Sequence, residues 1–164
     1  MLFEAGLRQS GSHMAHNISA LITRGPLDET PASEFDLPLI TVGDFVIVPL
    51  YVNYSDHWAE KLGMPRETHA NMAHDAPITL EFARQLNIAR FALIQTEYFG
   101  GFGEQFATVY AGNQRMMAVT KGGINDALRM IGVVRQDGMD EFDSMELGKY
   151  REFSTYFKAY WPSR

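Results

Sequence analysis

Residues 91–120 read FALIQTEYFGGFGEQFATVYAGNQRMMAVT, and this stretch decides the fold. Three of its segments are rich in the aromatic and β-branched residues that favour strands: Phe91–Phe99, Glu104–Ala111 and Arg115–Thr120. The connections between them, Gly100–Gly103 and Gly112–Gln114, are short enough for hairpins. The stretch therefore predicts a meander of three sequential antiparallel strands.

Helical patterns lie on both sides of this meander in the sequence. Pro77 suits the first turn of a helix that Asp75 caps, and Ala127, Leu128 and Ile131 recur at helical spacing after Ile124. We expect helices over residues 77–87, 123–132 and 147–160. The prediction is an α+β domain, an antiparallel β-sheet (meander) with helices packed mainly on one face.

Other segments have weaker patterns. Thr23–Asp36 contains two prolines and four acids and is interpreted as a loop. Leu39–Val52 is apolar and predicts a strand or a bent pair of strands with a turn at Gly43-Asp44. Pro49 favours an edge position or a bulge. Asn53–Asp75 is mixed and polar, and we assign no element there.

The N-terminal residues differ in character from the rest. Gly11-Ser12-His13-Met14 resembles a cloning scar, so residues 1–14 are interpreted as an expression tag or fused peptide and residues 15–164 as a single globular domain. Leu2, Phe3 and Leu7 form an apolar stripe. We expect residues 1–10 to dock on a surface, either as a helix that lays this stripe in a groove or as a strand added to a sheet edge.

Composition narrows the functional classes. The chain has no cysteine, which excludes disulfides, thiolate zinc sites and a cysteine nucleophile and fits a reducing cytoplasm. A formal charge of −6 argues against nucleic-acid binding and is compatible with a basic protein partner. The longest apolar run, Phe45–Val52, is far shorter than the roughly 20 residues that cross a bilayer, so we predict no membrane segment.

Histidines and hydroxyls do not form a known catalytic pattern. His69 and His74 are five residues apart, whereas ligands on one helix face prefer spacings of three or four, so neither they nor His57 predict a metal site. The Ser55-Asp56-His57 run lacks the separated arrangement of a hydrolase triad. We predict no catalytic residue, no cofactor and no metal.

The connection Gly100–Gly103, here called the glycine loop, has two interpretations. It is a hairpin turn with Phe102 packed on the domain, or it is a contact loop with exposed aromatic anchors and a polar rim. A phosphate cradle is disfavoured because a strand, and not a helix, follows the glycines. A buried Glu97–Glu104 pair would permit acid/base chemistry, but we expect both carboxylates to face solvent. The candidate contact residues are Phe99, Gly100, Gly101, Phe102, Glu104 and Gln105.

An acidic stretch before the last predicted helix is a second candidate. It has no lysine or arginine between Gln136 and Gly148. It is either a solvated loop or an interface in which acids steer a basic partner and Phe142 holds it. The candidate partner-binding residues are Asp137, Asp140, Glu141, Phe142 and Asp143.

Three short motifs resemble small bacterial immunity proteins, which are encoded beside secreted toxins. They are Thr96-Glu97-Tyr98-Phe99-Gly100-Gly101-x-Gly103-x-Gln105, Ile124-Asn125-x-Ala127-Leu128 and Asp140-Glu141-Phe142-Asp143. The resemblance covers residues 90–151. It implies a cytoplasmic, non-enzymatic inhibitor that binds a basic toxin domain and occludes its active site. Alternatives are a small enzyme or ligand-binding domain with a pocket beside residues 100–103, and a phage or plasmid accessory protein that binds a host factor.

Overall fold

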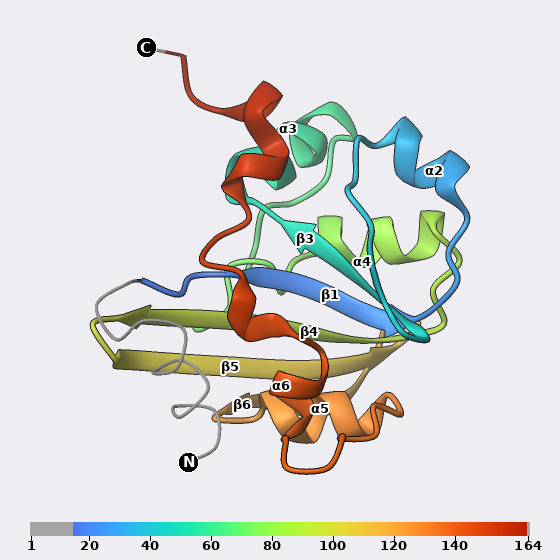
Figure 1. Ribbon diagram of the computed structural model, residues 1–164. Coiled ribbons are helices and arrows are strands. Elements are labelled where there is room, and N and C mark those ends of the chain that lie inside the picture. The colour runs from blue at the N-terminus through green and yellow to red at the C-terminus, as the bar shows by residue number, and fades with distance from the viewer. Residues whose placement is uncertain (1–14, 164) are drawn as a thin grey trace.

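The structure, a computed structural model, describes residues 15–163, within which six strands form one antiparallel sheet. The strand order is β2-β3-β1-β4-β5-β6. Figure 1 labels β1 and β3–β6 in this sheet. The strands are β1 (Ser19–Arg24), β2 (Ile40–Val42), β3 (Phe45–Leu50), β4 (Arg90–Phe99), β5 (Phe102–Ala111) and β6 (Gln114–Lys121). The α+β class and the predicted meander, now β4–β6, are confirmed.

The helices are short. They are α2 (Glu29–Glu34), α3 (Val52–Lys61), α4 (Pro77–Gln85), α5 (Ile124–Met130) and α6 (Glu141–Ser144), with the 3₁₀ helices η1 (Leu147–Lys149) and η2 (Ser154–Tyr160). None of those described is long and apolar enough to cross a membrane. The expected docking of residues 1–10 lies outside the described residues.

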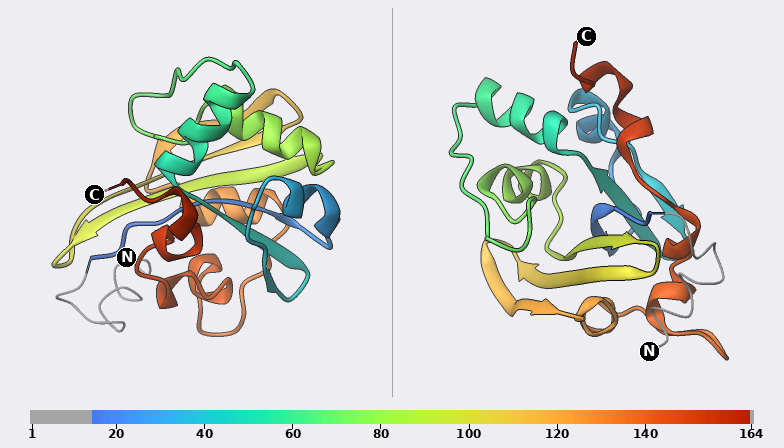
Figure 2. Two further views of the ribbon diagram at one scale, coloured as in Figure 1. Left: turned by 90° about the horizontal axis from the view of Figure 1, so that it is seen from above. Right: turned by 90° about the vertical axis from the view of Figure 1, so that its left-hand side faces the viewer.

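The helices cover both faces of the sheet, which corrects their expected placement mainly on one face. Residues of α2, α3, α4 and η2 pack with Leu21 and Leu93 in one core, whereas α5, α6 and η1 pack with Ile22 and Ile94 in the other. Figure 2 shows the two layers on opposite sides of the strands. The reason is that neighbouring residues of the central strands are apolar, so both faces need cover.

The predicted helix over 147–160 is wrong. The segment forms η1 and η2, separated by non-helical backbone around Arg151. Phe153 enters the core beneath α5, whereas Phe157 enters the core beneath α3. A continuous helix would place residues four apart on the same face, so it cannot fill both cores.

Four elements were not predicted. β1 is central, and α3 lies in the region left unassigned. α2 lies in the predicted Thr23–Asp36 loop, and α6 lies in the acidic stretch before the last predicted helix. The side chain of Asp28 caps α2 by accepting a hydrogen bond from the Thr30 amide at 2.9 Å. The predicted pair of strands with a turn at Gly43-Asp44 is confirmed as β2 and β3.

Five apolar residues of the strands and helices are buried in the two cores: Leu93, Val109, Leu128, Ile131 and Phe153. Leu128 is fully enclosed, and Met130 on the same helix is 43% exposed.

We predict that Leu128→Ala lowers the free energy of unfolding by about 2–5 kcal/mol, because it removes buried methyl groups and leaves a cavity. Met130→Ala, the control on the same helix, should change it by no more than about 0.5 kcal/mol. Urea unfolding of both variants measures the difference. Equal losses would contradict the packing of α5.

Candidate functional site

The tip of the β4–β5 hairpin presents two phenylalanines to solvent. Gly100 and Gly101 have φ angles of +61° and +83°, which form the two-residue turn that a tight hairpin requires. Phe99 pairs with Phe102 across this turn, so both side chains leave the same face of the hairpin. Their exposed fractions are 75% and 85%. Phe102 therefore does not pack on the domain.

Gly103 follows the turn and tolerates no side chain. Its φ is +151°, and a Cβ atom there would lie 1.8 Å from the carbonyl oxygen of Glu97. The close approach of the two backbones at this point holds the aromatic tip in place.

The acids beside the tip face solvent, as expected. Glu97 pairs directly with Glu104, and both are exposed. Gln95 donates a hydrogen bond to Glu97 Oε1 at 3.0 Å, and Lys121 Nζ lies 3.1 Å from Glu104 Oε1. Their exposure removes the desolvation that an acid/base pair would need.

Gln105 is buried and is not part of an exposed rim. Its Oε1 accepts a hydrogen bond from the Ile124 amide at 3.0 Å, at the start of α5. Gly123, the residue before α5, has no side chain to do this. Strand alternation explains the correction, because Gln105 points to the face opposite Glu104.

Most of the acidic stretch serves the fold, which corrects its expected role as a contact surface. Asp140 is buried, caps α6 by accepting from the Asp143 amide at 2.8 Å, and accepts from Asn125 Nδ2 at 3.1 Å. Buried Glu141 accepts from Arg129 Nε at 3.0 Å. Phe142 is fully enclosed in the core beneath α5.

Two of the predicted acids stay accessible. Asp137 is exposed and Asp143 is partly buried. Burial of the Asp143 carboxyl group raises its pKa, and the nearby Asp140 carboxylate raises the pKa further.

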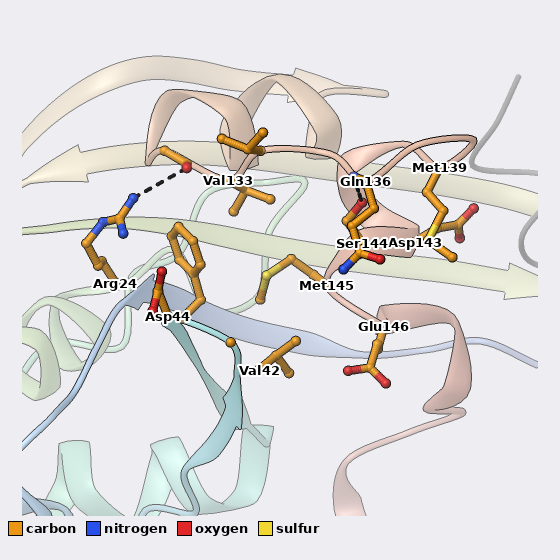
Figure 3. Close-up of a pocket in the computed structure, with 14 residues that line it drawn as sticks. Arg24, Val42, Asp44, Val133, Gln136, Met139, Asp143, Ser144, Met145 and Glu146 are labelled. Carbon is orange, nitrogen blue, oxygen red and sulfur yellow. Dashed lines mark hydrogen bonds between the residues drawn. The ribbon is translucent and has the colours of Figure 1, made fainter.

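Asp143 lines a cleft of about 510 Å³ between the β2–β3 turn and the segment after α5 (Figure 3). Its walls carry three acids and one base, together with two methionines: Arg24, Asp44, Met139, Asp143, Met145 and Glu146. The Arg24 guanidinium lies 4.7 Å from the centre of the Phe45 ring and donates to the Gly132 carbonyl at 3.4 Å.

The hairpin tip and the cleft do not form one surface. β1 runs antiparallel to β4, with Ser19 opposite Gln95 near the tip. Arg24, at the other end of β1, lines the cleft. The glycine loop and the acidic stretch, the two candidate contact segments, thus lie at different ends of the sheet.

The histidines have separate environments. His57 and His69 are exposed, whereas His74 is buried with its Nδ1 3.3 Å from Ser55 Oγ. Among residues 15–163, no three histidine or acidic side chains converge as a metal site requires.

A polar network that sequence reasoning missed joins α4 to the meander. Asp75 accepts from the Tyr110 hydroxyl at 2.6 Å and from Arg115 Nη2 at 2.8 Å, so it does not cap α4 as expected. The pKa of Tyr110 is raised to about 12, mainly by burial and secondly by the hydrogen bond to Asp75. The network is structural, since its groups satisfy one another.

Comparisons with models of protein families, with curated proteins and with solved structures found no match. The function therefore rests on the geometry of the surface. Among residues 15–163, the most exposed phenylalanines lie at the hairpin tip, and two exposed acids lie beside them.

We predict that Gly103→Ala costs more stability than Gly100→Ala. The Cβ atom added at Gly103 meets the Glu97 carbonyl, whereas a Cβ atom at Gly100 meets nothing within 4 Å. Gly100→Ala should therefore lower the free energy of unfolding only by the strain of a positive φ, about 1–2 kcal/mol. Urea unfolding compares the two. A smaller loss for Gly103→Ala would show that the hairpin relaxes without cost.

We also predict that stability falls as the pH drops from about 6.5 to 4. Burial lowers the pKa of His74 from 6.5 to about 4, so the unfolded chain takes up a proton before the folded chain does. Burial lowers the pKa of His16 as well, which acts in the same direction. Unfolding free energies across this range should show a shallower slope for His74→Gln; an unchanged slope would contradict the prediction.

Proposed function

We propose that this protein is a non-enzymatic binding protein that docks on a basic protein partner through the β4–β5 hairpin. The observation that carries the proposal is the pair Phe99 and Phe102, 75% and 85% exposed on one side of a glycine turn. Aromatic anchors on a pre-organised element supply contact area at little entropic cost, as binding hot spots do.

The charge of the partner follows from the surroundings of the tip. Glu97 and Glu104 lie on the same face of the hairpin as the two phenylalanines. Lys121 pairs with Glu104, and the whole chain carries a charge of −6. A positively charged partner would approach faster than a neutral one.

The most concrete form of the proposal is an immunity-type inhibitor of a bacterial toxin, acting in the cytoplasm. One of the three motifs that resemble such proteins spans residues 96–105 and contains the tip. In this mechanism the aromatic pair seats the hairpin in the toxin's substrate groove, and Glu97 and Glu104 occupy the positions of substrate anions. The buried acids at Asp140 and Glu141 do not take part, because they hold α5 and α6.

The test begins with capture of the partner from the native host and identification by mass spectrometry. Binding kinetics are then measured for Phe102→Ala and for Val134→Ala, a control that is 83% exposed beside the cleft at the other end of the sheet. We expect Phe102→Ala to speed dissociation by roughly 30-fold or more, the effect of a lost hot spot. Val134→Ala should have no effect.

A double Glu97→Gln/Glu104→Gln variant tests the electrostatic part. We expect slower association and a weaker dependence on salt, because screening acts within about 8 Å at physiological ionic strength. Loss of binding in Val134→Ala but not in Phe102→Ala would move the interface to the cleft. A captured partner that retains full toxic activity in the complex, or that is a host factor without such activity, would refute the immunity-type mechanism.

A further inference from the structure

The cleft between the β2–β3 turn and α6 takes no part in the function proposed for the hairpin tip, because the two lie at different ends of the sheet. Its volume of about 510 Å³ falls within the roughly 300–1,000 Å³ that is typical of ligand-binding pockets. Its walls come from the β2–β3 turn, the segment after α5 and residues 143–146. A cleft of this size accommodates a side chain of another molecule together with part of its backbone.

The floor of the cleft is apolar. Phe45, Val133 and Met145 line it and are almost fully buried, at 8%, 5% and 2% exposed. Two further apolar residues that line the cleft stay accessible, Met139 at 43% and Val134 at 83%. Methionine adapts its shape to a ligand because its unbranched side chain is flexible and polarisable. The cleft therefore offers apolar contact area that the described part of the chain leaves in water.

The charged groups around this apolar floor are mostly negative. Asp44, Asp143 and Glu146 line the cleft, whereas Arg24 is the single base among the described residues that line it. The Arg24 guanidinium is turned to the Gly132 carbonyl, 3.4 Å away (Figure 3). Neither Asp44 nor Asp143 forms an ion pair within residues 15–163. The cleft therefore favours a positively charged group over a negatively charged one.

The backbone at Glu146 gives an independent reason to assign a role to its carboxylate. Glu146 has a φ of +57° and a ψ of +27°, the left-handed conformation, directly after the residue that ends α6. Glycine is usual at this position because a side chain there costs strain. In the described part of the chain the Glu146 carboxylate forms one ion pair, with Lys149 at 3.4 Å, and both groups are exposed. Since an exposed pair contributes little to stability, the retained strain points to a role outside the fold.

We propose that the cleft is a second docking site, which takes a segment of a partner protein that presents an apolar side chain beside a lysine or arginine. The apolar side chain packs on Phe45 and Met145, and the positive group reaches Asp44 or Glu146. Figure 3 shows these two carboxylates on opposite sides of Met145, so a basic residue on either side of the apolar one finds a partner. Charge complementarity selects this occupant, because a second copy of this chain, with its charge of −6, brings mostly like charge to the acids.

A library of random peptides displayed on phage tests the proposal without a known partner. The library is panned against the whole protein, and clones are kept only if they also bind the Phe102→Ala variant, so that peptides held by the hairpin tip are discarded. We expect the remaining peptides to share an apolar residue next to a lysine or arginine. If no clone remains, or if the remaining peptides lack a basic residue, the proposal is overturned.

The affinity of a selected synthetic peptide is then measured for two double variants that remove the same charge. Asp44→Asn/Glu146→Gln should weaken binding roughly five-fold or more, because it removes both exposed ion-pair partners at the cleft. Glu34→Gln/Glu67→Gln removes two exposed acids that do not line the cleft and should leave the affinity within about two-fold, since salt screens such charges. Equal losses in the two variants, or no loss in the first, would refute the site.

A single substitution separates binding from stability. Glu146→Gly removes both the carboxylate and the side chain that the left-handed backbone disfavours. It should weaken binding of the peptide, whereas the midpoint of urea unfolding should stay the same or rise. A lower midpoint would show that Glu146 serves the fold and would contradict its assignment to the docking site.

Discussion

The pairing of β1 with both β3 and β4 is the constraint on which the rest of the structure depends. Without β1 the sheet would separate into a short β2–β3 hairpin and the β4–β6 meander, since no other strand within residues 15–163 joins them. β1 also divides the interior, because Leu21 enters one core and Ala20 and Ile22 enter the other. Six residues near the start of the described chain thus join strands that are distant in sequence and build two cores at once.

This explains which parts of the fold could be predicted from the sequence. The meander is local: each strand pairs with the next one through a glycine turn, and both the strands and the turns are visible in residues 91–120. β1 pairs with residues of β4 that are about seventy positions away. A short apolar run does not indicate which distant strand it will pair with. The six buried residues of β3 form a continuous apolar run without alternation. Such a run is typical of a strand that is buried on both faces of its sheet.

Which of the candidate contact residues are exposed and which are buried could not be predicted from the sequence. Asp137 and Asp140 are chemically alike, yet one is exposed and the other caps α6 and bonds Asn125. That division depends on how α5 and α6 pack, which spacing along the chain does not encode. The network of Asp75, Tyr110 and Arg115 was missed for the same reason, since these residues meet only through tertiary packing.

At the hairpin, strand alternation separates the residues that hold the fold from those that are available for binding. Tyr98 and Gln105 point toward α5, where both are buried and Gln105 binds the start of that helix. Their neighbours Phe99 and Glu104 point to the other face, where they are exposed. Because folding buries little of Phe99 or Phe102, the domain gains little hydrophobic stabilisation from them, and their solvent exposure favours association with another surface. In the proposed function, the partner would remove both side chains from water.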